Sequence, residues 1–281
     1  MNKSGLNLRA LRMMLAVVLV VGLAISACTP AGGEEADAGI PEIAVGMTEN
    51  GLTVPSEVPS GVVAFKMVGE ADAIPARLNE GVTVDQVNEA LMQPDPLAAL
   101  ALVTLLGGGS NTTDDKLTLD LQQGQHIIVN FPENAPPSVV PFMAGEPSGA
   151  TAPTADVTID MVDFNFVVPS EIESGPKVWQ INNKGTQWHE MAVVKLDEGV
   201  TVNDLVDMLM LEGASEEPPS FEGAPFEEVA FWAPNGPGET GWVTWDLPPG
   251  EYTVICFLPD VNGDMTPHVA HGMVGQLTVT E

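Results

Sequence analysis

The stretch Cys256-FLPDVNGDMTP-His268-VAH-Gly272-Met273 gathers a thiol, two imidazoles and a thioether in one short segment. Sulfur and imidazole are ligands that suit copper and zinc. The segment lies between two apolar, β-rich runs, GEYTVICF and MVGQLTV, which predict strands. The stretch therefore indicates either a metal site between two strands or a strand pair whose sulfur-bearing residues belong to the core.

Short strand patterns fill the second half of the chain. They are VTIDMVDFNFVV, VWQIN, HEMAVVKL, GWVTWDL, GEYTVICF and MVGQLTV, with Gly, Pro and Asn between them. Strands of this kind are typical of a mainly β protein built as a β-sandwich. One helix is expected among them, capped by Thr201 with Asp204, with an apolar face made by Val202, Leu205 and Leu209.

The chain contains two related halves. Val54-PSEVPS-Gly61 returns as Val168-PSEIES-Gly175, and Glu80-GVTV-Asp85 returns as Glu198-GVTV-Asn203. The second pair of segments opens the expected helix in each half. A period this long indicates a duplicated domain rather than a solenoid. The stretch Gly145–Asp156 has the composition of a linker, and its residues 148–154 form the predicted linker between domains at 40–147 and 155–281.

Two further repeated segments show which residues of the first half align with the metal-ligand candidates of the second half. The segments Asp120–Phe131 and Asp246–Phe257 align so that Asn130 stands where Cys256 does. The segments Pro137–Met143 and Pro267–Met273 align so that Ser138 matches His268 and Met143 matches Met273. The first half therefore lacks the thiol and imidazole candidates and keeps only the methionine, and we expect it to hold no copper.

The first 27 residues predict a signal peptide, with Lys3, Arg9 and Arg12 ahead of an apolar run that is short for a membrane span. Ile25-Ser26-Ala27-Cys28 resembles the bacterial lipobox, which implies cleavage before Cys28 and lipidation of its sulfur. Residues 28–40 are predicted to be a flexible tether. We expect an exported protein that is lipid-anchored to a bacterial membrane, facing the periplasm or the cell exterior.

The chain is strongly acidic. It has 39 Asp and Glu residues against 9 Lys and Arg, a formal net charge of −30. Such a surface repels nucleic acid and anionic headgroups and attracts cationic proteins or metal ions. If Cys28 carries lipid, Cys256 is the one free thiol of an exported chain. It is then either a buried core residue or a ligand.

Three segments resemble the cupredoxins, the blue copper proteins such as plastocyanin and azurin. Asn182-Asn183-Lys184-Gly185, leading to Trp188-His189, resembles the loop that carries that family's first histidine ligand. Tyr252-TVI-Cys256 resembles its penultimate strand, and His268-VAHG-Met273 with the strand after it resembles the plastocyanin ending. The resemblance implies two tandem Greek-key cupredoxin-like sandwiches, each with a short inserted helix.

The resemblance also implies a site. One type 1 copper ion would have His189, Cys256 and His268 as equatorial ligands and Met273 as the axial ligand. Eleven residues separate Cys256 from His268, more than the family usually has. Asn262-Gly263 favours a type I′ turn near the middle, so a small hairpin returns His268 to the thiol. Glu190 stands where the family commonly has Asn.

The implied function is one-electron transfer to a basic redox protein such as a cytochrome or oxidase. The alternative is a cupredoxin-like module for partner binding that is metal-free or sequesters copper. We expect no enzyme, because multicopper oxidases and nitrite reductases need histidines beyond the four of this chain. His271 is expected at the surface or behind the ligands, and the Asp260-VNG-Asp264 segment is expected to be a turn.

Overall fold

The computed structural model of the chain describes residues 39–48, 51–68, 73–93, 97–110, 112, 116–130, 136–212 and 224–281. The predicted signal peptide, Cys28 and nearly all of the tether lie outside these residues. Among the residues described, no helix has the length and apolar character needed to cross a membrane.

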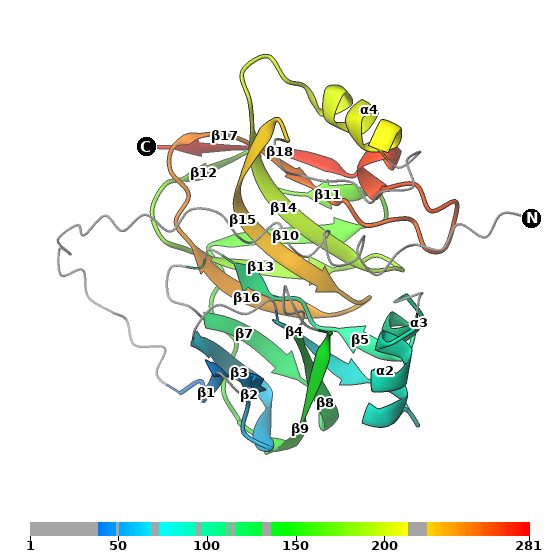
Figure 1. The fold of residues 1–281 in the computed structure, drawn as a ribbon. Helices are drawn as coiled ribbons and strands as arrows, with labels where there is room; N and C mark the ends of the chain where they lie inside the picture. Colours follow the sequence, from blue (N-terminus) through cyan, green and yellow to red (C-terminus); the bar gives the residue numbers. More distant parts are fainter. Residues whose placement is uncertain are drawn as a thin grey trace, which may run out of the picture.

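The described chain is mainly β (Figure 1). The first half has β1 (Glu42–Thr48), β2 (Gly51–Thr53), β3 (Glu57–Val68), β4 (Ala73–Leu78), α2 (Val84–Leu91), α3 (Leu97–Leu100), β5 (Val103–Leu105), β6 (Gly109–Ser110), β7 (Lys116–Leu121), β8 (Gly124–Asn130) and β9 (Ser138–Pro147). The second has β10 (Val157–Val162), β11 (Asn165–Val167), β12 (Glu171–Glu173), β13 (Lys177–Asn183), β14 (His189–Leu196), α4 (Val202–Glu212), β15 (Phe226–Asn235), β16 (Thr240–Trp245), β17 (Gly250–Ile255), a 3-10 helix (His268–His271) and β18 (Val274–Thr280).

The two halves share one strand topology. β1 pairs with β2 antiparallel and with β3 parallel, and β10 pairs in the same way with β11 and β13. The neighbours β4, β8 and β9 of the first half correspond to β14, β17 and β18 of the second. The predicted tandem sandwich, with a helix after the equivalent strands β4 and β14, is confirmed.

The halves join through equivalent strands. β16 pairs antiparallel with β7, so one sheet runs through both sandwiches (Figure 1). Trp232 of β15 is fully buried at this junction, between Gly107 and Gly241, where an added Cβ would come within 2.4 and 2.5 Å of its ring. Arg77 Nη2 also donates to Glu239 Oε1 across the halves at 2.9 Å. The close approach of backbone to indole ties the two sandwiches together.

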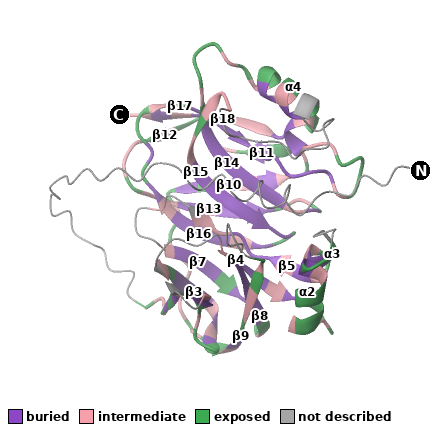
Figure 2. Ribbon diagram, in the orientation of Figure 1, coloured by how far each residue is buried: buried purple, intermediate pink, exposed green. Residues whose placement is uncertain are grey.

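The inserted helices form where their caps predict. Thr201 N and Oγ1 donate to Asp204 Oδ2 at 2.8 and 2.6 Å, and Asp204 N donates back to Thr201 Oγ1. Thr83 and Gln86 make the equivalent capping box at α2. Leu205 of α4 packs into an apolar cluster with residues of β14, which explains why HEMAVVKL is buried on both faces rather than alternating (Figure 2).

The strand pattern VTIDMVDFNFVV is divided by a turn that the sequence reading missed. β10 ends at Val162 and β11 begins at Asn165, and the intervening Phe164 has a positive φ of 59°. A non-glycine residue in this region marks a tight turn. The turn brings Asp163 and Phe164 to the metal-ligand candidates.

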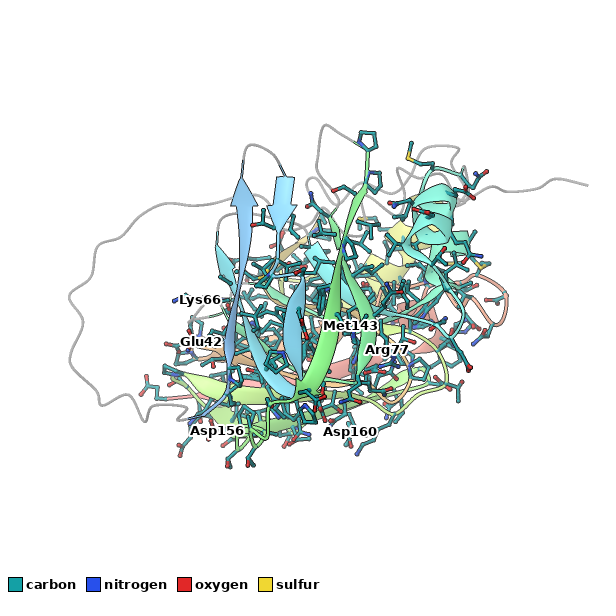
Figure 3. The ribbon with its side chains drawn as sticks, turned by 90° about the horizontal axis from the view of Figure 1, so that it is seen from below. Glu42, Lys66, Arg77, Met143, Asp156 and Asp160 are labelled. Carbon is teal, nitrogen blue, oxygen red and sulfur yellow. The ribbon has the colours of Figure 1, made fainter. Side chains whose placement is uncertain are left out.

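The strand register corrects one predicted repeat. Asn130 pairs with Ser138, and Ile255 pairs with Val274, which sets Cys256 opposite Met273. Ser138 therefore corresponds to Met273, and the predicted matches of Ser138 with His268 and of Met143 with Met273 are wrong. Met143 lies well inside β9 and is 40% exposed (Figure 3). The similar Pro-rich starts of the two segments favoured the wrong alignment.

Candidate metal centre

The four ligand candidates come from separate points of the second sandwich. His189 opens β14, Cys256 follows β17, His268 opens the 3-10 helix, and Met273 precedes β18. All four are fully buried, with 0% exposure. In the sheet, β17 lies between β14 and β18. The neighbouring ends of these three strands bring the four residues together at one end of the sandwich.

The two imidazoles and the thiol converge. His189 Nδ1 lies 3.2 Å from His268 Nδ1, and Cys256 Sγ lies 3.3 Å from the same nitrogen. Two nitrogens that bind one ion at about 2.0 Å each lie roughly 3.2 Å apart at near-tetrahedral angles, and a sulfur at about 2.3 Å lies slightly farther off. The observed spacings fit one small soft-ligand ion.

The long loop after Cys256 returns His268 as predicted. Pro259 and Pro267 form an antiparallel bridge, and Asp260 N donates to Thr266 O at 2.9 Å. Closer to the site, His268 N donates to Leu258 O at 2.8 Å. The loop is thus a small hairpin whose two ends hold the thiol and the imidazole side by side.

The tip of that hairpin is not the predicted type I′ turn. A type I′ turn needs positive φ at both central residues, and neither Asn262 nor Gly263 has one. The Asp260 carbonyl instead accepts from both Gly263 N and Met265 N, and the positive φ of 66° falls at Met265. The extra residues are taken up in a wider, helix-like turn.

Backbone bonds hold Met273 beside the other candidates. Met273 N donates to His268 O at 2.9 Å, and Cys256 N donates to Met273 O at 3.4 Å. Gly272, at a φ of 96°, ends the 3-10 helix in the left-handed conformation and turns the chain into β18. The backbone of Met273, whose side chain is fully buried, is therefore held beside Cys256 and His268.

Asp163 orients the ring of His189, a role that the sequence reading did not find. Asp163 Oδ1 lies 3.0 Å from His189 Nε2, and Thr186 Oγ1 donates to Asp163 Oδ2 at 2.6 Å. Histidines that bind a metal through one ring nitrogen usually donate the N–H of the other ring nitrogen to a carboxylate or a carbonyl. With Asp163 beside Nε2, the lone pair of His189 Nδ1 is free to bind a metal ion. Gly185 is required here, since an added Cβ would come within 2.5 Å of His189 Nε2.

Glu190 anchors the residue that follows the thiol. Its side chain is buried, and its Oε1 accepts a hydrogen bond from Phe257 N at 3.1 Å. Burial raises the pKa of Glu190 to about 8, with the nearby Glu228 adding to the shift. Glu190 is therefore protonated at neutral pH and fixes the Cys256 loop without adding a charge to the centre.

Burial also sets the protonation of the ligand candidates. Loss of solvation lowers the pKa of His189, lowers that of His268 to about 4, and raises the pKa of the Cys256 thiol well above its ordinary value. Among the residues that the structure describes, none is a hydrogen-bond partner of His268 Nε2. The ligand atoms of His189, Cys256 and His268 thus face one another with little positive charge among them. One bound cation would satisfy all three.

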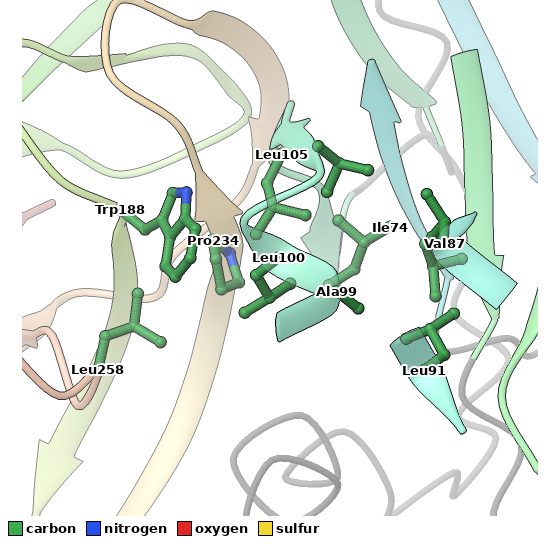
Figure 4. Close-up of a pocket in the computed structure, with 11 residues that line it drawn as sticks. Ile74, Val87, Leu91, Ala99, Leu100, Leu105, Trp188, Pro234 and Leu258 are labelled. Atoms are coloured by element: carbon green, nitrogen blue, oxygen red, sulfur yellow. The ribbon is translucent and has the colours of Figure 1, made fainter. Parts of the chain in front are cut away.

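The first half of the chain packs against residues next to the metal-ligand candidates. An apolar cavity of about 30 Å³ lies between the halves (Figure 4). Trp188 and Leu258, neighbours in sequence of the ligand candidates, line it from the second half, and Leu100 and Leu105 line it from the first. The first sandwich therefore packs close to residues that flank the thiol and the first imidazole.

No family model matches the chain, and no curated protein matches it. Among solved structures it is similar to reduced auracyanin from Roseiflexus castenholzii, with 21% identity, 44% of this chain and 95% of that chain covered, and a TM-score of 0.30. It is similar to auracyanin A, a "blue" copper protein from Chloroflexus aurantiacus, with 23% identity, 44% and 98% covered, and a TM-score of 0.30. It is also similar to a multicopper oxidase, with 11% identity, 85% of this chain and 88% of that chain covered, and a TM-score of 0.24.

The strand topology described above makes the fold a tandem pair of Greek-key, cupredoxin-like sandwiches, as the sequence resemblance implied. In the second sandwich, His189, Cys256 and His268 form a cluster able to hold one metal ion. The function proposed below rests on the geometry of this cluster.

Proposed function

We propose that the chain is an electron-transfer protein that holds one type 1 copper ion in its second sandwich. His189, Cys256 and His268 bind the ion, and Met273 is its axial ligand. The observation that carries the proposal is the approach of one thiol and one imidazole nitrogen, at 3.3 and 3.2 Å, to the same nitrogen of His268. Copper supplies one-electron chemistry between two oxidation states.

The chain's own part is to keep that cluster rigid and dry. The ligand candidates are held by the ends of β14 and β17 and by the hairpin before β18, and each is fully buried. Asp163 holds the first imidazole and Glu190 holds the loop after the thiol. Ligands fixed in this way move little when the charge at the centre changes, which favours fast electron exchange.

Phe164 marks the route from the cluster to the surface. Its ring centroid lies 5.2 Å from that of His268, and it is only half-buried. The acidic chain, with a net charge of −30, favours a basic partner such as a cytochrome or an oxidase. We further propose an exported protein anchored to a bacterial membrane through lipid on Cys28, with the first sandwich as a spacer or docking module.

One observation favours a second candidate function, copper sequestration without redox cycling. His268 is fully buried, so no imidazole edge is open to a redox partner. A carrier and a store differ in rate: a carrier exchanges electrons quickly, whereas a store holds Cu(I) and reacts slowly with proteins.

Protein-film voltammetry and stopped-flow mixing with a basic cytochrome separate the two functions. We expect a reversible one-electron couple and electron transfer that slows as ionic strength rises, because the acidic surface steers the partner. Copper that binds but shows no reversible couple would leave only sequestration. Failure to bind copper at all would leave a metal-free module for partner binding.

A further inference from the structure

A second cluster of metal-ligand side chains lies on the loop next to the buried centre. His271 Nε2 lies 3.2 Å from Asp264 Oδ1 and 3.8 Å from Asp260 Oδ2. One ligand atom from each of the three residues lies within 4.8 Å of the others. This cluster shares no residue with the buried centre, and the electron-transfer proposal does not use it.

Asp260 shows that the cluster is more than a group of surface charges. The residue is 9% exposed, and neither of its carboxylate oxygens has a hydrogen bond within the described chain. Asp260 Oδ2 packs against the backbone of Gly263, and a Cβ at that position would come within 2.1 Å of it. A residue larger than glycine would therefore displace the carboxylate. The Asp260 side chain is 12% exposed and its one ion-pair partner in the described chain is the His271 imidazole at 3.8 Å, so a cation bound at this mostly buried carboxylate would improve its surroundings.

The other two members are also held in place. Asp264 Oδ1 accepts from Thr266 N at 2.9 Å. The ring of His271 lies against Phe164, with centroids 4.7 Å apart. The imidazole therefore points its Nε2 at both carboxylates without depending on an ion to order it.

We propose that Asp260, Asp264 and His271 form a second, surface metal site that takes one divalent transition-metal ion such as Zn²⁺ or Cu²⁺. One imidazole with two carboxylates suits these ions, whereas Ca²⁺ takes six or more oxygen ligands and Mg²⁺ prefers oxygen and water. The acidic surface raises the local concentration of divalent cations. Solvent can supply the remaining ligands, because Asp264 and His271 are partly exposed.

An ion in this position has a structural effect. Asp260 and Asp264 lie on the hairpin that follows Cys256, and His271 ends the 3-10 helix that His268 begins. The ion would therefore fasten the hairpin to the helix and hold the approach to His268 in one conformation. Stabilisation follows from binding to the folded chain alone.

Calorimetric titration of the protein with Zn²⁺ tests the site, with thermal unfolding as a second readout. We expect His271→Gln and Asp264→Asn each to weaken one Zn²⁺ site by at least about tenfold, and to remove the rise in Tm that this ion gives. Both residues are exposed enough for the variants to fold. Asp207→Asn, which removes an exposed carboxylate of α4, is the matched control and should bind as the unchanged protein does.

The buried centre is kept apart by Cys256→Ala, which removes its thiol. This variant should keep the Zn²⁺ site that His271→Gln loses, whether or not the buried centre binds copper. Equal Zn²⁺ affinity and stoichiometry in the unchanged protein, His271→Gln and Asp264→Asn would overturn the second site.

Discussion

Asp163 Oδ1 lies 3.0 Å from His189 Nε2, so a carboxylate on the β10–β11 turn fixes the imidazole that opens β14. This contact sets which ring nitrogen faces Cys256 and His268. It links a turn that carries no metal ligand to the geometry of the proposed copper centre, and it gives the most specific test of how that centre is held.

Asp163→Asn should weaken copper binding by about 10- to 100-fold, because the amide holds the imidazole less firmly and lowers its basicity. Competition with a copper chelator of known affinity measures the change. Asp160→Asn is the matched control, since Asp160 pairs with Lys184 at 2.6 Å and touches no ligand candidate. Equal losses in the two variants would show that Asp163 acts only through general charge.

Gly185→Ala should displace the His189 ring, because the new Cβ would come within 2.5 Å of both His189 Nε2 and Asp163 Oδ1. We expect copper affinity to fall by at least about tenfold. Gly108→Ala is the control, since a Cβ there meets its nearest neighbour at an ordinary 3.7 Å. If Gly185→Ala binds copper as tightly as Gly108→Ala does, the close packing around His189 is unimportant.

Glu190→Ala should cost about 1–3 kcal/mol in the free energy of unfolding, because it removes the buried carboxyl oxygen that accepts from Phe257 N. Glu190→Gln keeps an acceptor oxygen and the neutral state that Glu190 has at neutral pH, so it should cost much less. Urea unfolding at pH 7 compares the two variants. Equal losses would mean that the hydrogen bond to Phe257 N contributes nothing.

The pH dependence of stability should report Glu228. Burial raises the pKa of its carboxyl to about 8 in the folded chain, against an ordinary 4.5. The folded state thus binds the extra proton between these values, so stability falls as pH rises from 4.5 through 8, by up to about 1.4 kcal/mol per pH unit. Glu228→Gln removes the share of this loss that comes from Glu228, while Glu190, whose pKa burial also raises to about 8, keeps its own share.

Urea unfolding at pH 5 and pH 9 checks the sign. Glu228→Gln should exceed the unchanged protein in stability at pH 9, by about 1 kcal/mol or more, and differ little at pH 5. Glu227→Gln, at the exposed neighbouring position, is the control and should show no such difference. A larger gain at pH 5 than at pH 9 would contradict the raised pKa of Glu228.

Patterns confined to one segment predicted the local structure well. The caps at Thr83 and Thr201 begin helices α2 and α4, and the repeated segments led to two sandwiches with the same topology. The return of His268 to Cys256 by a small hairpin was also predicted from the length of one continuous stretch, although the type I′ turn expected at Asn262-Gly263 was wrong. These features depend on neighbours in the sequence, which are visible without a structure.

Features that depend on pairing between distant strands were missed or misplaced. Asp163 reaches His189 only because a turn with Phe164 at positive φ splits one apparent strand into two. The match of Met143 with Met273 failed because residue type was followed instead of register, which only the pairing of β8 with β9 reveals. The break in apolar alternation at Asp163 was the one signal that pointed to the turn.

The most direct test of the central claim is the visible absorption spectrum after one equivalent of Cu²⁺ is added to the protein and to Cys256→Ser. A copper ion bound to Cys256, His189 and His268 should give an intense blue thiolate-to-copper band that Cys256→Ser lacks. No blue band in the unchanged protein, or an equally strong band in Cys256→Ser, would contradict a copper centre built on this thiol.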